Sequence, residues 1–174
     1  MNRIRIVSRA LHFLCKAAAI LYLVTAAYAL LVILLSRFAE TALFRVRPEG
    51  SFTIQLPFSE SPFLIGDHTA YFLIMMVVTI GLYGLFGWLL GDVFKAFSRE
   101  KLFTPGNVSI LTRFYRLNFY VPVSVLVFTL LFTSEVDDLI LLIILHGVIG
   151  MLAWFLAAIL NQGIPLQDEY DQTL

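Results

Sequence analysis

Residues 139–160 read LILLIILHGVIGMLAWFLAAIL, a run in which His146 is the one ionisable side chain. A hydrocarbon layer of about 30 Å is crossed by roughly 20 apolar residues in a helix, because a helix bonds its own backbone groups. This run is therefore long enough and apolar enough to cross a bilayer. The composition agrees, since 60% of the 174 residues are hydrophobic and 14% are charged, which is too apolar for an ordinary soluble domain.

Three other stretches complete the predicted set of spans. We predict membrane helices at about residues 13–36, 69–96, 108–133 and 139–161. The third is the least apolar because it contains Asn118 and Pro122, but its helix can begin early if Arg113 and Arg116 extend to the lipid headgroups. The predicted fold class is an all-α integral membrane protein, one domain over residues 1–174 with four transmembrane helices.

The basic residues are distributed unevenly around these spans. Nine precede the apolar run 17–36 or lie between the apolar runs 69–91 and 117–133: Arg3, Arg5, Arg9, Lys16, Lys95, Arg99, Lys101, Arg113 and Arg116. Only Arg37, Arg45 and Arg47 lie between the first two spans. Cytoplasmic loops are enriched in Lys and Arg, so we predict a multi-pass protein of the cytoplasmic membrane with both termini in the cytoplasm. The net charge of zero gives no basis for direct nucleic-acid binding.

Residues 37–68 form the predicted loop on the outer face. Residues 51–56 alternate polar and apolar side chains, which is typical of a β-strand, and residues 47–50 carry a turn signal just before them. Residues 43–46 then supply the partner strand of a small β-hairpin. A hairpin is marginal alone in water, so we expect it to lie against the helix ends, where it either binds a ligand or only seals the bundle.

The cytoplasmic loop, residues 97–107, ends in a helix-start signal. Thr104 is placed as the N-cap, Pro105 occupies the first helical position, and Phe103 and Val108 are spaced as a hydrophobic staple. A helix therefore begins here. It either lies on the inner membrane surface or, as the pattern favours, continues directly into the third span.

The cytoplasmic tail, residues 162–174, is acidic. Residues 161–165, NQGIP, predict the end of the last helix. Asp168, Glu169 and Asp171 follow beneath the membrane beside the basic loop. They form salt bridges to that loop, or they make a docking site for a basic soluble protein.

Two passages resemble a bacterial membrane family catalogued as domain of unknown function 2975. Residues 102–108, LFTPGNV, followed by Leu111, are similar to that family's loop before its third helix, and residues 163–174, GIPLQDEYDQTL, are similar to its closing motif. The resemblance implies a four-helix protein of the bacterial inner membrane. It also implies a gene neighbourhood with a small helix-turn-helix regulator, and hence a membrane partner for such a regulator.

His146, Asp92 and Asn118 form the candidate polar site within the predicted spans, where a charge is costly and commonly functional. His146 either makes one interhelical hydrogen bond or serves in a proton relay, a ligand contact or a metal site. Asp92 is expected to form an ion pair with Lys95, or with Arg113 or Arg116 across the loop. Asn118, with Pro122, marks a local loosening of the third helix. Gly81, Gly84, Gly87 and Gly91 give the second helix a smooth face for packing or for a lipid.

The sequence contains no enzyme signature, and the lone Cys15 cannot form an intramolecular disulfide. We predict a non-enzymatic membrane regulator that uses no cofactor or metal and contacts membrane lipids and a soluble helix-turn-helix protein. The predicted partner-binding residues are Phe103, Thr104, Pro105, Asn107, Arg113, Arg116, Asp168, Glu169 and Asp171. The alternatives are a small oligomeric transporter or channel, and an accessory subunit of a larger membrane complex.

Overall fold

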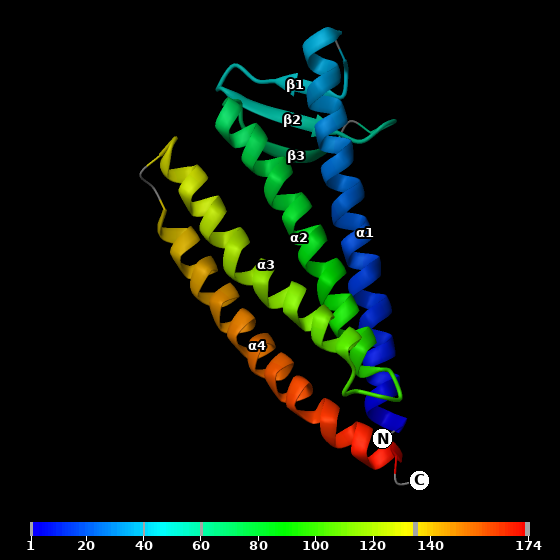
Figure 1. Ribbon diagram of the computed structural model, residues 1–174. Coiled ribbons are helices and arrows are strands. Elements are labelled where there is room, and N and C mark those ends of the chain that lie inside the picture. The colour runs from blue at the N-terminus through cyan, green and yellow to red at the C-terminus, as the bar shows by residue number, and fades with distance from the viewer. Residues whose placement is uncertain (1, 40, 60, 134–135, 173–174) are drawn as a thin grey trace. The chain divides into compact units, whose positions relative to one another are not determined.

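The computed structural model describes residues 2–39, 41–59, 61–133 and 136–172 (Figure 1). The described part contains four helices and one three-stranded sheet. In chain order these are α1 (Asn2–Phe38), β1 (Phe44–Val46), β2 (Ser51–Gln55), β3 (Pro62–Asp67), α2 (Ala70–Phe97), α3 (Pro105–Leu130) and α4 (Asp137–Gln172).

Three of these helices are long and apolar enough to cross a membrane. They are Arg3–Phe38 in α1, Ala70–Phe97 in α2 and Leu139–Gln167 in α4. Helix α3 is not among them, because Arg113, Arg116 and Asn118 lower its hydropathy. The chain is thus mostly helical with three candidate membrane spans, as expected of a membrane protein.

The chain divides into two compact units. Unit 1 comprises Met1–Lys16 and Trp88–Leu174, and unit 2 comprises Ala17–Gly87. The boundary falls inside α1 and inside α2, so each of these helices contributes one part to each unit.

In unit 2 the sheet is larger than the sequence predicts. The predicted hairpin is confirmed, since β1 pairs antiparallel with β2 and Phe44 lies opposite Ile54. Gly50 in the connecting turn has a φ of +81°, which favours glycine. The third strand, β3, was not predicted; it pairs antiparallel with β2 in the order β1-β2-β3 (Figure 1). Its pattern was missed because most of its side chains are exposed.

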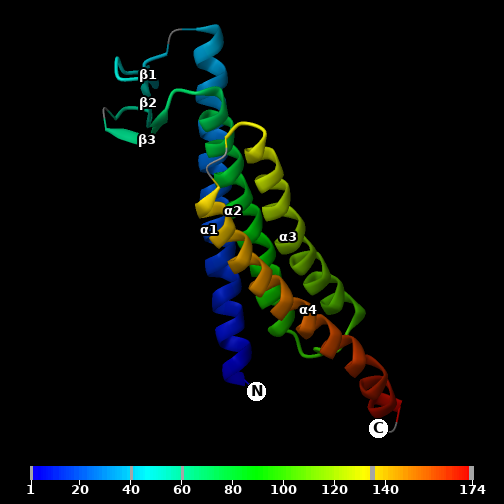
Figure 2. The same cartoon turned by 90° about the vertical axis from the view of Figure 1, so that its left-hand side faces the viewer.

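The sheet packs against the helices of unit 2 through one buried cluster. Phe52 and Ile54 alternate along β2 and are fully buried. They meet Ala29 and Val32 of α1 and Leu73 of α2. The alternating side chains of β2 therefore enter an apolar core at one end of this helix pair, and Figure 2 shows the strands beside α1 and the start of α2.

Two glycines of α2, Gly81 and Gly84, face α1 in unit 2, and the contact at Gly84 is too close for a side chain. A Cβ atom at Gly84 would lie 2.8 Å from Cγ of Leu23, and one at Gly81 would lie 3.8 Å from Cβ of Ala26. Helices approach closely where side chains are absent. The smooth face of α2 is occupied here by α1.

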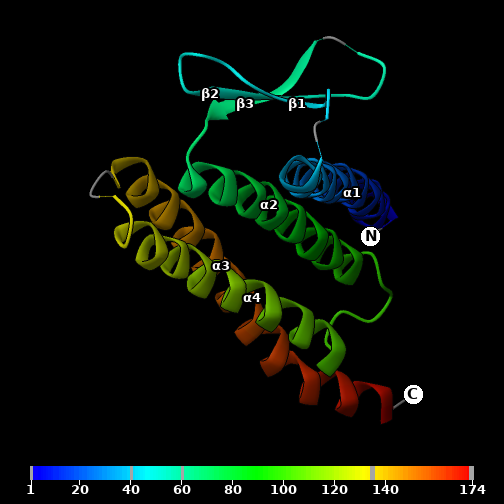
Figure 3. The same ribbon diagram turned by 90° about the horizontal axis from the view of Figure 1, so that it is seen from above.

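In unit 1, α3 and α4 run antiparallel and lie side by side (Figures 1 and 3). The predicted end of the last helix near residue 161 is wrong, because α4 continues through Pro165 to Gln172. Proline within a helix removes one backbone hydrogen bond and usually kinks or ends it. Here the ring of Phe103 packs against Gly163, and this tertiary contact supports the helical turn that local propensity alone would end.

Candidate functional site

The loop between α2 and α3 is organised around Asn107, which is fully buried. Its side-chain amide donates to the carbonyl oxygens of Lys101 at 3.2 Å and Leu102 at 2.9 Å. Its Oδ1 accepts from the guanidinium of Arg99 at 3.0 Å. Asn107 was predicted to contact a partner, but its burial makes it a positioning residue that holds the loop backbone.

The predicted start of α3 is confirmed. Thr104 has extended backbone angles, its hydroxyl accepts from the backbone N–H of Asn107 at 3.3 Å, and Pro105 follows as the first helical residue. The N-cap hydroxyl satisfies one of the backbone donors left free at a helix start. Asn107 thus donates one bond through its backbone N–H, donates two through its side-chain amide and accepts one at Oδ1, which fixes the loop against the first turn of α3.

Two further contacts attach this loop to other elements of unit 1. The Phe103 ring lies against Gly163 of α4. Arg5 of α1 pairs with the exposed carboxylate of Glu100, with 3.4 Å between Nη1 and Oε1. We name residues 98–106 together with residues 161–172 the loop–tail surface; the Phe103–Gly163 contact makes it a continuous feature of unit 1.

Several predicted partner-binding residues are exposed on this surface or beside it. Phe103, Pro105, Arg113, Arg116 and Glu169 are exposed, and Thr104 is half-buried. The side chains of Asp168 and Asp171 lie outside the described residues, so the predicted acidic strip is placed only by the helical backbone of α4. Pro105 and Phe103 give the surface an apolar part, and the two arginines give α3 a basic part.

In the interior of unit 1, His146 and Asn118 contact each other. The His146 Nδ1–H donates to Oδ1 of Asn118 at 2.8 Å. Asn118 is buried, and its amide donates in turn to the carbonyl of Phe114 at 2.8 Å. The structure therefore brings together two of the three polar residues predicted within the spans, as an interhelical hydrogen bond between α3 and α4.

Asp92, the third of these residues, has an unpredicted partner. Its carboxylate lies 2.9 Å from Nζ of Lys16, whereas the expected partners were Lys95, Arg113 and Arg116. Lys16 also lies 3.6 Å above the ring of Trp88, a favourable cation–π geometry. The expected ion pair exists, but it joins α1 to α2.

A second contact joins the same two helices next to this ion pair. His12 Nδ1–H donates to the carbonyl oxygen of Gly91 at 2.7 Å. A Cβ atom at Gly91 would lie 3.3 Å from Cε of Lys16 and 3.4 Å from Cβ of Cys15, so glycine allows the close approach. Lys16 was overlooked as the partner of Asp92 because the two residues are far apart in the sequence. Gly91, next to Asp92, was the available signal that another helix approaches closely there.

Among the described residues, no three His, Cys, Asp or Glu side chains gather as a metal site. The polar contacts of unit 1 are paired hydrogen bonds and ion pairs, which position helices. No nucleophile–base pair was found among the contacts described above. Searches against protein-family models, curated proteins and solved structures found no match to this chain.

Proposed function

We propose that this chain is a bacterial inner-membrane regulator without enzymatic activity, with four membrane spans and both termini in the cytoplasm. Its loop–tail surface binds a soluble protein, and a helix-turn-helix regulator is the partner that the family resemblance suggests. The observation that carries the proposal is the attachment of the loop to α4 through Phe103 and Gly163.

The pairing of α3 with α4 supports the proposal of a fourth span. Helix α4 carries an apolar window long enough to cross a bilayer, and α3 runs antiparallel beside it. The bond from His146 to Asn118 fixes their relative depth. If α4 crosses the membrane, this bond supports a crossing by α3 at the same depth, with the buried Asn118 side chain shielded from lipid.

The exposed side chains of α3 support this placement. Tyr120, Val123 and Val127 are at least half exposed in the structure, at 69%, 50% and 57%. Apolar side chains on a membrane helix are covered by lipid. The same helix begins at Thr104 within the ordered loop, so α3 links a lipid-facing segment to the cytoplasmic surface.

The loop–tail surface suits protein recognition because its backbone is already ordered. Asn107 uses its side-chain donors and acceptor on the loop itself, which reduces the entropy lost when a partner binds. The exposed ring of Phe103 and the nearby Arg113 and Arg116 offer apolar and charged contacts. Regulation then requires two helix arrangements, of which one presents this surface.

Accessible cysteines test the topology. With Cys15 replaced by Ala, we expect a membrane-impermeant maleimide to label Ser59→Cys and Val136→Cys in intact cells, but to label Ser98→Cys only after lysis. Detection of an N-terminal or C-terminal tag on the outer surface of intact cells would exclude the proposed orientation.

Direct binding tests the partner. The full chain in nanodiscs is titrated with a purified helix-turn-helix regulator from the gene's own neighbourhood. We expect the affinity to fall about tenfold or more when Arg113 and Arg116 are both changed to Gln, or when Asp168, Glu169 and Asp171 are neutralised. Arg45→Gln on β1 is the control. Undiminished binding by both sets of variants would remove the loop–tail surface and the neighbouring basic part of α3 from the proposal.

A further inference from the structure

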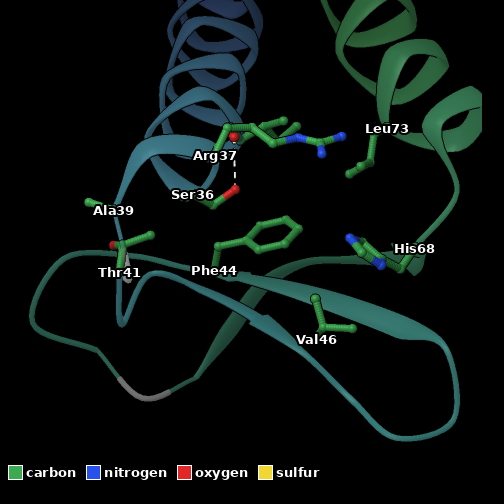
Figure 4. Close-up of a pocket in the computed structure, with 9 residues that line it drawn as sticks. Ser36, Arg37, Ala39, Thr41, Phe44, Val46, His68 and Leu73 are labelled. Atoms are coloured by element: carbon green, nitrogen blue, oxygen red, sulfur yellow. Dashed lines mark hydrogen bonds between the residues drawn. The ribbon is translucent and has the colours of Figure 1, made fainter.

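Unit 2 contains a cavity of about 370 Å³ where α1 ends and the sheet begins (Figure 4). Its lining residues come from α1, from the segment after it, from β1, from the link between β3 and α2, and from α2: Ile33, Ser36, Arg37, Ala39, Thr41, Phe44, Val46, His68 and Leu73. Ligand pockets in proteins commonly measure about 300–1,000 Å³. The cavity is therefore large enough for a headgroup and the first part of an attached chain.

Three polar side chains of this cavity, those of Arg37, Thr41 and His68, can donate hydrogen bonds to a ligand. Arg37 presents a guanidinium that extends from α1 towards the start of α2, on the side where the His68 ring lies (Figure 4). The Thr41 hydroxyl oxygen accepts from the backbone N–H of Leu43 at 3.2 Å, so its own O–H remains to donate. Three donors, one of them a permanent cation, favour a ligand with several acceptor oxygens and negative charge.

The fourth polar side chain of the lining is not a donor to a ligand. The Ser36 hydroxyl donates to the carbonyl of Ile33 at 2.8 Å (Figure 4), so it has no proton left for an anion. Among the described lining residues there is no carboxylate to neutralise Arg37. Glu40, which follows Ala39 in the chain, lies outside the described residues.

The other half of the lining is apolar. Ile33 and Leu73 come from the two helices, and Phe44 and Val46 come from alternate positions of β1. The Phe44 ring stacks on Phe52, with centroids 5.5 Å apart, and also contacts the His68 ring at 5.8 Å. A fixed aromatic surface thus lies next to the donors, which suits an apolar chain joined to an anionic head.

We propose that this cavity binds an anionic amphiphile, a phosphate group carried on an acyl chain, with the phosphate at Arg37, Thr41 and His68 and the chain along Ile33, Phe44 and Leu73. Arg37 lies at the end of the apolar run of α1, which is the level of the lipid headgroups in the proposed topology. The source of the ligand is then a membrane lipid. The site does not depend on the partner proposed for the loop–tail surface.

Native mass spectrometry of the delipidated full chain tests the site with three matched probes. Lysophosphatidic acid carries the phosphate and the chain, monoacylglycerol carries only the chain, and glycerol 3-phosphate carries only the phosphate. We expect lysophosphatidic acid to bind at least tenfold more tightly than either of the others. Equal binding of monoacylglycerol would overturn the anion site, and equal binding of glycerol 3-phosphate would overturn the lipid assignment in favour of a soluble phosphate.

Variants locate the binding. Arg37→Gln removes the cation and is expected to weaken lysophosphatidic acid binding about tenfold. Val46→Trp fills the cavity from an exposed position and is expected to abolish it. Arg45→Gln, on the opposite face of the same strand, is the matched control and should bind normally. Circular dichroism and the elution volume in size-exclusion chromatography verify that each variant is folded. If a variant does not fold, His68→Gln takes its place. Equal binding by all folded variants would show lipid adsorbed elsewhere and overturn the proposal.

Discussion

The ring of Phe103 lies directly against the backbone of Gly163, so that a Cβ atom at residue 163 would occupy the space of the ring. This contact joins two segments that are separated by the whole α3–α4 hairpin. Each of the predictions below concerns a contact of this kind, in which one element fixes the position of another.

Replacing Gly163 with Ala is expected to displace Phe103 and loosen the loop. Ala is better than Gly in a helix by about 1 kcal/mol, but inserting a methyl group into an occupied space costs roughly 1–3 kcal/mol. We therefore expect faster hydrogen exchange at residues 98–106, measured by mass spectrometry. Gly147→Ala in the same helix is the control, because nothing lies within 4 Å of a Cβ there. Unchanged exchange in Gly163→Ala would show that the loop does not depend on the contact.

Replacing Asn107 with Ala is expected to disorder the same loop by a different route. The change leaves the carbonyls of Lys101 and Leu102 without the donors they have now, at a cost of about 1–3 kcal/mol. Unfolding in mixed micelles with increasing sodium dodecyl sulfate measures the loss. Ser109→Ala, an exposed position two residues further along α3, should change little. Equal stability of the two variants would contradict the central role of Asn107.

The bond between His146 and Asn118 is expected to couple α3 to α4. Asn118→Leu and His146→Leu, alone and combined, form a double-mutant cycle in the same unfolding experiment. The expected coupling energy is about 1 kcal/mol, since interhelical hydrogen bonds in membranes contribute roughly 0.6–2 kcal/mol. Ser124→Ala is the control because its hydroxyl donates within its own helix, to Tyr120. Strictly additive effects of the two leucines would mean that the bond carries no net stability.

Removing one partner of the Lys16–Asp92 ion pair is expected to destabilise the protein more than removing both. Their side chains are 17% and 31% exposed, so a single loss should cost about 1–3 kcal/mol, between the values for surface and fully buried pairs. Lys16→Met with Asp92→Leu should be more stable than either single variant.

Lys95→Met provides the matched control for that pair. Lys95 was the expected partner of Asp92 but is not its partner in the structure, and its side chain is exposed. Stability in mixed micelles should therefore remain close to that of the unchanged chain. If Lys95→Met lost as much stability as Lys16→Met, the assignment of Lys16 as the partner of Asp92 would be wrong.

The sequence predicts those features that depend on local patterns. The apolar runs predicted the long helices, the alternation of residues 51–56 predicted β2, and Thr104 with Pro105 predicted the start of α3. The structure confirms all three predictions. Whether α3 crosses the membrane stays a prediction, because its hydropathy does not decide the matter.

Features that depend on distant contacts were missed or wrong. The strand β3 lacks buried alternation and is held by its pairing with β2. The end of α4 was placed at residue 161 because Gly163 and Pro165 are poor helix formers, yet Phe103 packs on that turn. Asp92 was expected to pair with Lys95 on its own helix or with Arg113 or Arg116 across the loop, whereas Lys16 reaches it from α1. Spacing along the chain does not show which helix lies opposite.

The length of α4 has a mechanical consequence. With 36 residues, the helix is about 54 Å long at 1.5 Å per residue, which exceeds a hydrocarbon layer of about 30 Å. The last dozen residues would then project as a lever arm, about 18 Å beyond the apolar run. A tilt of about 10° within the lipid would swing its tip by roughly 3 Å, a displacement comparable to the reach of a hydrogen bond.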